Sequence, residues 1–256
     1  MVLFPSIEPR GRLEVNNSKN LKKSINGISY IDFSDFMEVP AGIVLKNENH
    51  SIESLFNFIL KKCCFEKSLE DRIGFNRKND RLKIVELNQN HTNIIVNACE
   101  KIKNNADGLY VSSSDIVLVI KTADCFPVFL NDGITVGLLH VGWRGCLTGI
   151  ISNFFKEVYG FKPQKAKVAI GPGIGSCCFK VSPEVALLLD KKYRRFKKGN
   201  FYLDLQGFIV DELAKNQIKY ILRNNYCTAC NDKMFYSYRQ EGKDVKQMLS
   251  YICKGG

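Results

Sequence analysis

The sequence predicts an α/β (α+β layered) fold, in which helices pack on a mixed sheet. The first observation is that strand-length apolar segments and amphipathic helical segments follow one another over residues 39–224. The second is that the strands are not strictly separated by helices, which argues against a doubly wound parallel sheet. The third is that no proline-rich or low-complexity linker interrupts the chain. We therefore expect one domain over 1–256, in which 1–38 is the least informative part.

Strands are indicated by alternation or by short continuous apolar runs. We expect them at 39–46, 81–87, 115–125, 126–130, 134–143, 167–172, 201–205 and 218–224. The turn Asn131-Asp132-Gly133 suits the positive φ values of a tight hairpin, so it joins the fourth and fifth of these strands.

Helices are indicated by apolar stripes and by capping residues. One helix is expected over 52–63, and a second over 146–160, where Gly160 ends it. The pair Ser182-Pro183 supplies an N-cap and a first-turn proline for a third, and a fourth follows residue 205.

Composition limits the functional classes. The 256 residues are 45% hydrophobic and 25% charged, which is ordinary globular usage. No apolar run reaches the ~20 residues of a membrane span, and the first 15 residues lack the pattern of a secretory signal. We therefore expect a cytoplasmic protein with no membrane partner, in which the ten cysteines are reduced.

The chain is basic, with 37 Lys and Arg against 26 Asp and Glu, a net charge of +11. The run KKYRRFKK (191–198) is read as a solvated surface turn or, alternatively, as a patch for phosphate or nucleic acid. No helix-turn-helix or aromatic RNA-binding motif accompanies it. We expect small anionic ligands and no nucleic acid.

Three polar segments follow apolar strands and contain two of the three histidines. They are LNQNH, ending at His91, KTADC, ending at Asp124 and Cys125, and HVGWRG, starting at His140. Two imidazoles and one thiolate suit Zn²⁺ or copper and leave one tetrahedral position open, as in a catalytic site. The same residues also permit a Cys125 nucleophile with His140 as its base, or a buried cysteine beside two structural histidines.

Other polar segments give weaker indications. GPGIGSCCF (171–179) lacks the pattern of a phosphate loop, so Gly171 and its neighbours are expected to permit close backbone approach at a site wall. Arg239 and Arg144 are candidate anion contacts. The CxxC of Cys227 and Cys230 has no second CxxC to complete a zinc ribbon, so every cysteine except Cys125 is assigned to packing.

Six segments in order resemble the YfiH or laccase-domain family, also described as multicopper polyphenol oxidoreductases and as purine nucleoside phosphorylases. They are L-x-Q-x-H (87–91), ADGLYVS (106–112), TADCFPVFL (122–130), HVGWRG (140–145), AIGPGIGSCCFKV (169–181) and CTAC…FYSYR (227–239), within a match over 39–240. The resemblance implies a layered fold similar to that of cytotoxic necrotizing factor. It also implies zinc bound by His91, Cys125 and His140.

The implied activity is phosphorolysis of adenosine, inosine, guanosine and methylthioadenosine, with adenosine deamination. Phosphate would attack C1′ while Lys46 and Arg239 hold it, and Asp124 would orient a ligand, move a proton or simply stabilise a turn. The older laccase name requires several copper centres, for which three histidines do not suffice.

Two departures from the family pattern bear on activity. The N-terminal S-T-R-x-G-G-V-S of the family corresponds to GIVLKNENH (42–50), which lacks the glycine loop, and the tail becomes RQEGKDVKQ. Alternatives are therefore a Cys/His thiol hydrolase linked to peptidoglycan editing, or a binding protein without turnover. We expect a monomer or a homodimer.

Overall fold

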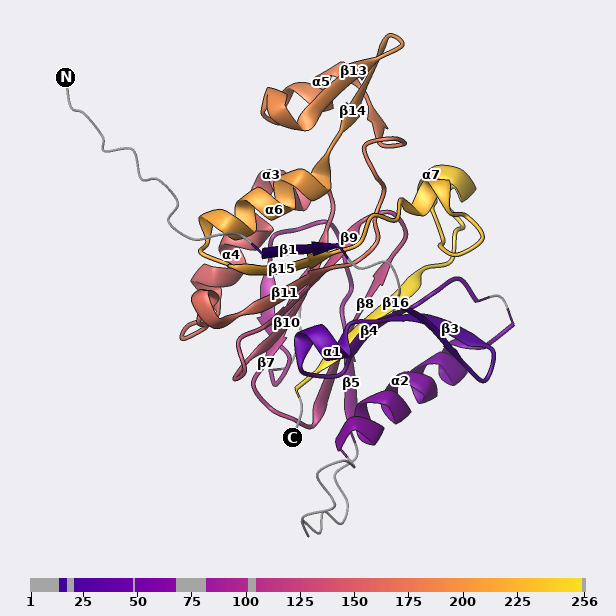
Figure 1. Cartoon of the computed structure of the whole chain (residues 1–256), viewed down its shortest axis with the longest axis vertical. Coiled ribbons are helices and arrows are strands. Elements are labelled where there is room, and N and C mark those ends of the chain that lie inside the picture. The colour runs from indigo at the N-terminus through magenta and orange to yellow at the C-terminus, as the bar shows by residue number, and fades with distance from the viewer. Residues whose placement is uncertain (1–13, 18–20, 48, 68–81, 101–104, 255–256) are drawn as a thin grey trace, which may run out of the picture.

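The computed structural model describes residues 14–17, 21–47, 49–67, 82–100 and 105–254. The first 13 residues, on which the expectation about a secretory signal rests, lie outside these ranges. Two large mixed sheets, one small sheet and a few helices make up the described chain (Figure 1).

The first large sheet, sheet A, has the strand order β1-β15-β11-β9-β10-β7-β6. Its antiparallel centre is the predicted hairpin, in which Val136 pairs with Asn131 and Val141 with Phe126. Parallel pairs flank this centre at both ends. The strands are β1 (Glu14–Asn17), β6 (Ile95–Asn97), β7 (Gly108–Val111), β9 (Phe126–Asn131), β10 (Val136–Val141), β11 (Lys167–Ile170) and β15 (Tyr220–Arg223).

The second large sheet, sheet B, has the order β2-β3-β4-β16-β8-β5 and is antiparallel except for the β5–β8 pair. Its strands are β2 (Lys22–Ile25), β3 (Ile28–Asp32), β4 (Ala41–Val44), β5 (Lys83–Glu86), β8 (Ile116–Thr122) and β16 (Met248–Cys253). The short helix α1 (Ser34–Met37) joins β3 to β4.

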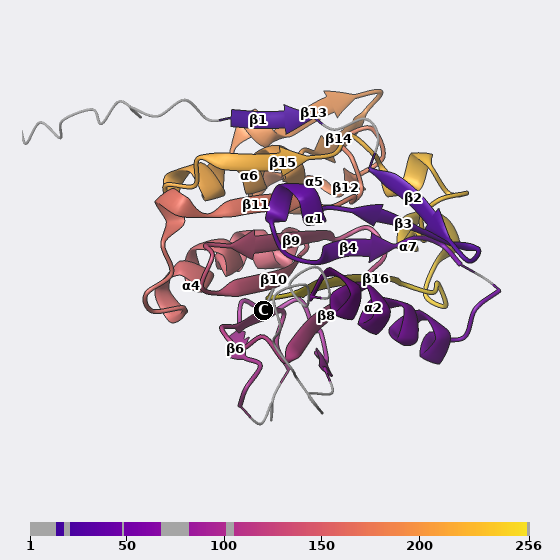
Figure 2. The ribbon, with the colours of Figure 1, turned by 60° about the horizontal axis from the view of Figure 1, so that its bottom comes forward.

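The two sheets stack face to face between two helical layers. Alternate residues of each strand face opposite sides, so Leu138 and Leu118 enter one core cluster between the sheets. On the outer face of sheet A, Val128 and Leu139 pack against α4 (Ile150–Glu157) and α6 (Leu205–Lys215). On the outer face of sheet B, Val119 packs against α2 (Ile52–Lys67). Figures 1 and 2 show the resulting order of helices, sheet, sheet and helix.

A small three-stranded sheet projects from this body beside α5 (Pro183–Leu187) (Figure 1). It is made of β12 (Lys180–Val181), β14 (Asn200–Leu203) and β13 (Arg194–Lys197). Most of the basic run 191–198 therefore forms the short 3₁₀ helix η3 (Lys191–Tyr193) and strand β13, where a simple surface turn was expected. The remaining short helices are η2 (Pro163–Lys165), η4 (Thr228–Cys230) and α7 (Tyr238–Glu241).

The layered α/β prediction is confirmed, and two helix predictions need correction. The helix expected over 146–160 is two helices, α3 (Trp143–Thr148) and α4, separated by Gly149 at a φ of 79°. A residue with that φ closes one helix in the left-handed conformation and cannot continue it. The helix expected from Ser182 covers only Pro183–Leu187 before the chain turns toward η3.

Candidate metal centre and its cavity

The chain crosses from sheet B to sheet A between β8 and β9, and Cys125 lies on this crossing. His140 is near the end of β10, on the same strand face as Leu138, which packs between the sheets. His91 lies in the loop between β5 and β6. The structure brings these three residues together, with their ligand-type atoms within 4.8 Å of one another.

His140 is oriented by a buried carboxylate. Its Nδ1 lies 2.7 Å from Oδ1 of Asp107, a side chain with no solvent exposure. This contact assigns the proton to Nδ1 and leaves Nε2 to face the other two residues, as in metal-bound histidines with a carboxylate partner. Asp107 lies just before β7, so the pairing of β7 with β10 sets the contact.

The loop that carries His91 is fastened by the same carboxylate. Asp107 accepts hydrogen bonds from the backbone N–H of His91 at 3.0 Å and of Thr92 at 2.6 Å, and from the Thr92 hydroxyl at 2.8 Å. His91 has a φ of 58°, in the left-handed region that non-glycine residues seldom adopt. The hydrogen bonds to Asp107 support this conformation. Burial alone would raise the pKa of the Asp107 carboxyl, but His140 and the two Thr92 donors lower it to about 2.

The Cys125 thiol and the His140 imidazole favour each other's charged forms. Burial opposes ionisation of the Cys125 thiol, but His140 and His91 together lower its pKa to about 6. Burial likewise opposes charge on His140, whereas Cys125 and Asp107 raise its pKa to about 9. The Cys125 Sγ also lies 3.8 Å from His91 Nε2. These surroundings therefore favour the thiolate, which is the form of cysteine that binds metal or acts as a nucleophile.

Gly142 leaves the space that this group of side chains occupies. A Cβ at this position would lie 2.8 Å from Cys125 Sγ and 3.2 Å from His91 Cδ2. Gly142, the first glycine of HVGWRG, is thus required for the close approach of Cys125 and His91 to the backbone, and it also follows the end of the strand.

The three residues open into a cavity of about 610 Å³. One part of its wall is cationic, with Arg144, Arg239 and Lys243. Arg144 stacks on the Trp143 ring at 4.4 Å, and Arg239 lies 5.6 Å from the Phe179 ring centroid. The apolar part of the wall is formed by Trp143, Ile174, Phe179, Leu205 and Val245. Such a lining can receive an aromatic or sugar group next to an anion.

Asp124 lines the cavity, but both of its carboxylate oxygens are engaged. Oδ1 accepts from the Thr228 hydroxyl at 2.6 Å, and Oδ2 accepts from the Arg239 backbone N–H at 2.8 Å. Its φ of 92° places it at a sharp turn before Cys125. Asp124 therefore joins the crossing to the segments that hold Thr228 and Arg239.

Two predicted site residues lie apart from this cavity. Lys46 is not among its lining residues; its Nζ is 3.2 Å from Glu241 and 5.2 Å from the Tyr236 ring. Gly171 is buried at the end of β11, where a Cβ would lie 2.6 Å from both Ile43 and Pro127. Its lack of a side chain serves packing between the sheets, and Ile174 of the same loop reaches the cavity.

The structure adds residues that the sequence did not single out. Asp107 lies within the family segment ADGLYVS. The segment alone does not indicate that this aspartate contacts the His140 side chain and the His91 backbone. Gln89 lines the cavity and pairs with the backbone of Lys121 through both ends of its amide, at 2.8 Å each. Lys243 is a third cation of the wall.

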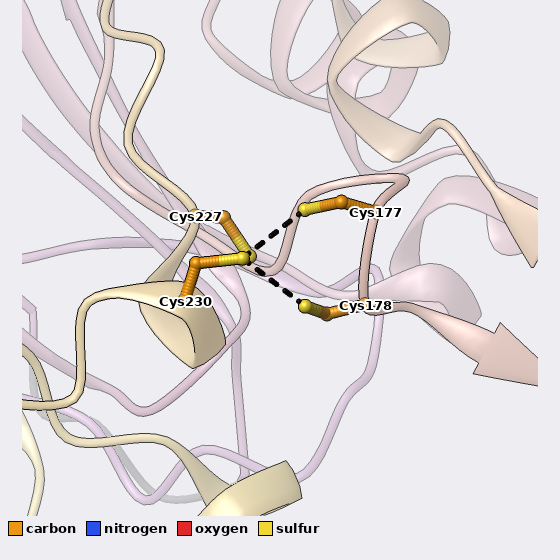
Figure 3. A group of neighbouring side chains, drawn as sticks. All are labelled: Cys177, Cys178, Cys227 and Cys230. Atoms are coloured by element: carbon orange, nitrogen blue, oxygen red, sulfur yellow. Dashed lines mark hydrogen bonds between the residues drawn. The ribbon is translucent and has the colours of Figure 1, made fainter.

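The CxxC, assigned to packing from the sequence, lies beside a second cysteine pair. The sulfurs of Cys177, Cys178, Cys227 and Cys230 all lie within 4.8 Å of one another (Figure 3). The vicinal pair follows β11 and the CxxC follows β15, and these two strands are neighbours in sheet A. Among the described residues, this cluster and the His91 site are the groups able to hold a metal ion.

The fold and the site together define a layered α/β protein with a candidate metal centre made of two histidines and one cysteine. Residues 67–254, more than half of the chain, match the family described as multi-copper polyphenol oxidoreductase laccase, and the chain belongs to this family. The resemblance to the YfiH or laccase-domain family is thereby confirmed.

Curated relatives carry the name purine nucleoside phosphorylase. One from Rickettsia prowazekii is 32% identical over 61% of this chain and 70% of its own length. Another, from Aquifex aeolicus, is 28% identical over 72% of this chain and 92% of its own length.

Solved structures show the same fold. YlmD from Geobacillus stearothermophilus has a TM-score of 0.72 and 21% identity, covering 93% of this chain and all (100%) of that one. The Bacillus licheniformis protein YfiH has a TM-score of 0.67 and 24% identity, covering 90% of this chain and 99% of that one. No helix in the described part of this chain is long and apolar enough to cross a membrane.

Proposed function

We propose that this protein is a zinc-dependent purine nucleoside phosphorylase that acts on adenosine, inosine, guanosine and methylthioadenosine, with adenosine deamination as a side activity. The observation that carries the proposal is that His91, Cys125 and His140 converge on a cavity with a cationic wall. The names of the curated relatives support the reaction class.

The donor set fits Zn²⁺. His140 has its Nδ1 held by Asp107, Cys125 has a lowered thiol pKa, and Gly142 leaves room beside both His91 and Cys125. Three such protein ligands leave one tetrahedral position open. When bound, Zn²⁺ supplies a Lewis acid at this open position. Copper also accepts these donors, and we choose zinc because the proposed reactions involve no electron transfer.

The chain's own residues position the two substrates. Trp143 and Phe179 offer aromatic faces to a purine, while Arg239 and Arg144 offer guanidinium groups to phosphate. A phosphate oxygen attacks C1′ of the ribose and forms the C–O bond of ribose 1-phosphate. The C1′–N9 bond breaks, and the purine leaves with its electron pair and is protonated. Asp107 and Asp124 are positioning residues in this scheme, because they contact site residues and backbone groups.

The test is turnover of the four nucleosides with and without inorganic phosphate. The zinc-loaded wild type should release free base only with phosphate, together with an equal amount of the sugar 1-phosphate. This product is ribose 1-phosphate from adenosine, inosine and guanosine, and 5-methylthioribose 1-phosphate from methylthioadenosine. Cys125→Ala should lose at least a hundredfold in turnover, while Cys99→Ala, which changes an exposed cysteine elsewhere, should match the wild type. Absence of product from the wild type, or equal turnover by Cys125→Ala, would refute the proposal.

The phosphate role is tested at Arg239. Arg239→Gln removes the guanidinium from the cavity wall, so the KM for phosphate should rise roughly tenfold or more, the loss expected for one charged hydrogen bond. The KM for inosine should change much less. Lys233→Gln removes an exposed cation from the same segment and serves as the control. Equal phosphate KM values in the two variants would contradict the assignment.

One observation favours a second candidate. In the metal-free state, Cys125, His140 and Asp107 form the thiolate, imidazole and carboxylate sequence of a thiol hydrolase, such as one acting on peptidoglycan-precursor amides. Metal analysis separates the two candidates. One zinc equivalent per chain that His91→Ala removes supports the phosphorylase, whereas native protein whose zinc content His91→Ala leaves unchanged and whose Cys125 is rapidly alkylated supports the hydrolase.

We also place the protein in the cytoplasm. Nine of its ten cysteines, including the crowded group of Figure 3, are free thiols in the structure, and such thiols persist in a reducing compartment.

A further inference from the structure

We propose that Cys177, Cys178, Cys227 and Cys230 bind a single structural Zn²⁺ ion that fixes one wall of the cavity. This second site is separate from the His91 site in residues and in donor type. It uses four of the cysteines that the proposed reaction leaves without a role.

The sulfur positions match a tetrahedral centre. Zinc–sulfur bonds of about 2.3 Å place the sulfurs of a ZnS₄ group about 3.8 Å apart. Here Cys230 Sγ lies 3.4 Å from Cys177 Sγ and 3.2 Å from Cys178 Sγ, and all four sulfurs lie within 4.8 Å of one another. Figure 3 shows the two pairs pointing toward one another from opposite sides. The space between them suits one ion.

The backbone around the cluster is organised for this arrangement. Gly173 and Cys227 form an isolated parallel bridge, and the Thr228 N–H donates to the Gly173 carbonyl at 3.1 Å. The CxxC turn is the 3₁₀ helix η4, which brings its two sulfurs to one side. The Gly175 N–H donates to Cys227 Sγ at 3.2 Å, a contact that stabilises a ligating thiolate.

A disulfide explains the cluster less well. Cys230 Sγ has two sulfur neighbours at nearly equal distances, 3.4 and 3.2 Å, and all four cysteines are free thiols in the structure. Four thiolates around one point instead satisfy a closed structural zinc site, with no position left for a substrate. Zinc is preferred to iron because nothing in the proposed reaction requires a redox centre.

The cluster is connected to the cavity by direct hydrogen bonds. The carbonyl of Cys178 accepts from Arg239 Nη1 at 3.1 Å, and Thr228, inside the CxxC, donates to Asp124. Phe179, which follows the vicinal pair, lines the cavity beneath Arg239. An ion at the cluster would therefore hold the segments that carry the aromatic and cationic walls.

The experiment is a metal count by mass spectrometry on protein purified under reducing conditions. The wild type and Cys99→Ser should each contain two zinc equivalents per chain, whereas Cys125→Ala and Cys230→Ser should each contain one. With Co²⁺ in place of zinc, the strong thiolate charge-transfer absorption of a four-sulfur site should persist in Cys125→Ala and vanish in Cys230→Ser.

Four outcomes would overturn this second site. They are no zinc in Cys125→Ala, equal zinc in wild type and Cys230→Ser, iron in place of zinc, or a disulfide among the four cysteines of freshly purified protein. If Cys230→Ser does not fold, the zinc and cobalt results for wild type and Cys125→Ala still decide whether the second site exists. Failure of the nucleoside assay leaves this count unaffected, so the two proposals stand or fall separately.

Discussion

Asp107 is the residue on which most of the His91 site depends. Its fully buried carboxylate contacts His140 directly and holds the backbone on both sides of His91. A buried charge is tolerated only when its oxygens are paired in this way. One side chain therefore sets the orientation of two of the three candidate ligands.

We predict that Asp107→Asn weakens zinc binding at the His91 site by roughly 10–100-fold, the usual effect of removing the carboxylate behind a ligating histidine. Competition with a chromophoric chelator measures this affinity. Asp132→Asn is the matched control, because Asp132 is also buried and accepts backbone N–H groups, from Ile134, Thr135 and Lys162. Equal zinc affinities in the two variants would contradict the role of Asp107 in orienting the zinc ligands.

The three candidate ligands could be predicted from the sequence, but the carboxylate that orients two of them could not. His91, Cys125 and His140 are visible because polar residues follow apolar strands. Asp107 precedes a strand that becomes a partner of β10, and this pairing is set by the tertiary fold. Lys46 was expected at the phosphate site from alignment to a family pattern, whereas in the structure it pairs with Glu241 outside the cavity wall.

At the scale of elements, the β8–β9 crossing explains why the site is where it is. β8 belongs to sheet B and β9 to sheet A, so the turn between them, with Asp124 and Cys125, joins the end of a strand in one sheet to the start of a strand in the other. Every residue of β9 and β10 is buried, because helices cover one face and sheet B covers the other. The crossing turn therefore leads into a pair of strands that are buried on both faces.

A second buried carboxylate, that of Asp32, joins strand β3 of sheet B to strand β2 and to helices α1 and α2. Asp32, at the end of β3, accepts from Lys23 Nζ of β2 at 2.9 Å and from the Ser34 N–H of α1 at 3.0 Å, with Lys62 of α2 at 3.5 Å. Burial alone would raise the pKa of Asp32, but these partners lower it below 3.8.

We predict that Asp32→Asn lowers the free energy of unfolding by about 1–3 kcal/mol at neutral pH. Because the folded pKa is lowered, this contribution is complete above pH 3.8, the unfolded value, and disappears as the pH falls through the folded pKa. Urea unfolding of both proteins across this range measures the difference. Asp35→Asn, at an exposed position in α1, should have almost no effect, and a difference independent of pH would contradict the charge argument.

Element prediction succeeded where the pattern is local. The hairpin of β9 and β10, strand β15 and helix α2 follow from alternation, turn residues and an apolar stripe. The division of the 146–160 helix depends on the φ that Gly149 adopts, which the apolar pattern does not contain. Strands β1 and β16 escaped prediction because their pairing comes from distant segments, as with the parallel partners Glu14 and Tyr220. The β2–β3 hairpin was also missed, although its Asn26-Gly27 turn is a local signal.

At the scale of the whole molecule, the sequence predicts the layered α/β class but not the stacking of two mixed sheets. The order of strands places β11 beside β15, and this neighbourhood unites the vicinal cysteines with the CxxC about fifty residues away. No spacing rule for metal ligands relates segments so far apart, so the cluster was assigned to packing. Part of the net charge of +11 comes from residues that line the cavity, namely Arg144, Arg239 and Lys243.

The central claim is that the His91 site performs phosphorolysis. The most direct measurement follows inosine in ³¹P and ultraviolet assays on one zinc-quantified sample, with and without phosphate. The account predicts hypoxanthine and ribose 1-phosphate in equal amounts, strictly dependent on phosphate and on the zinc that His91→Ala removes. Hypoxanthine formed equally well without phosphate, or formed at the same rate by His91→Ala, would contradict it.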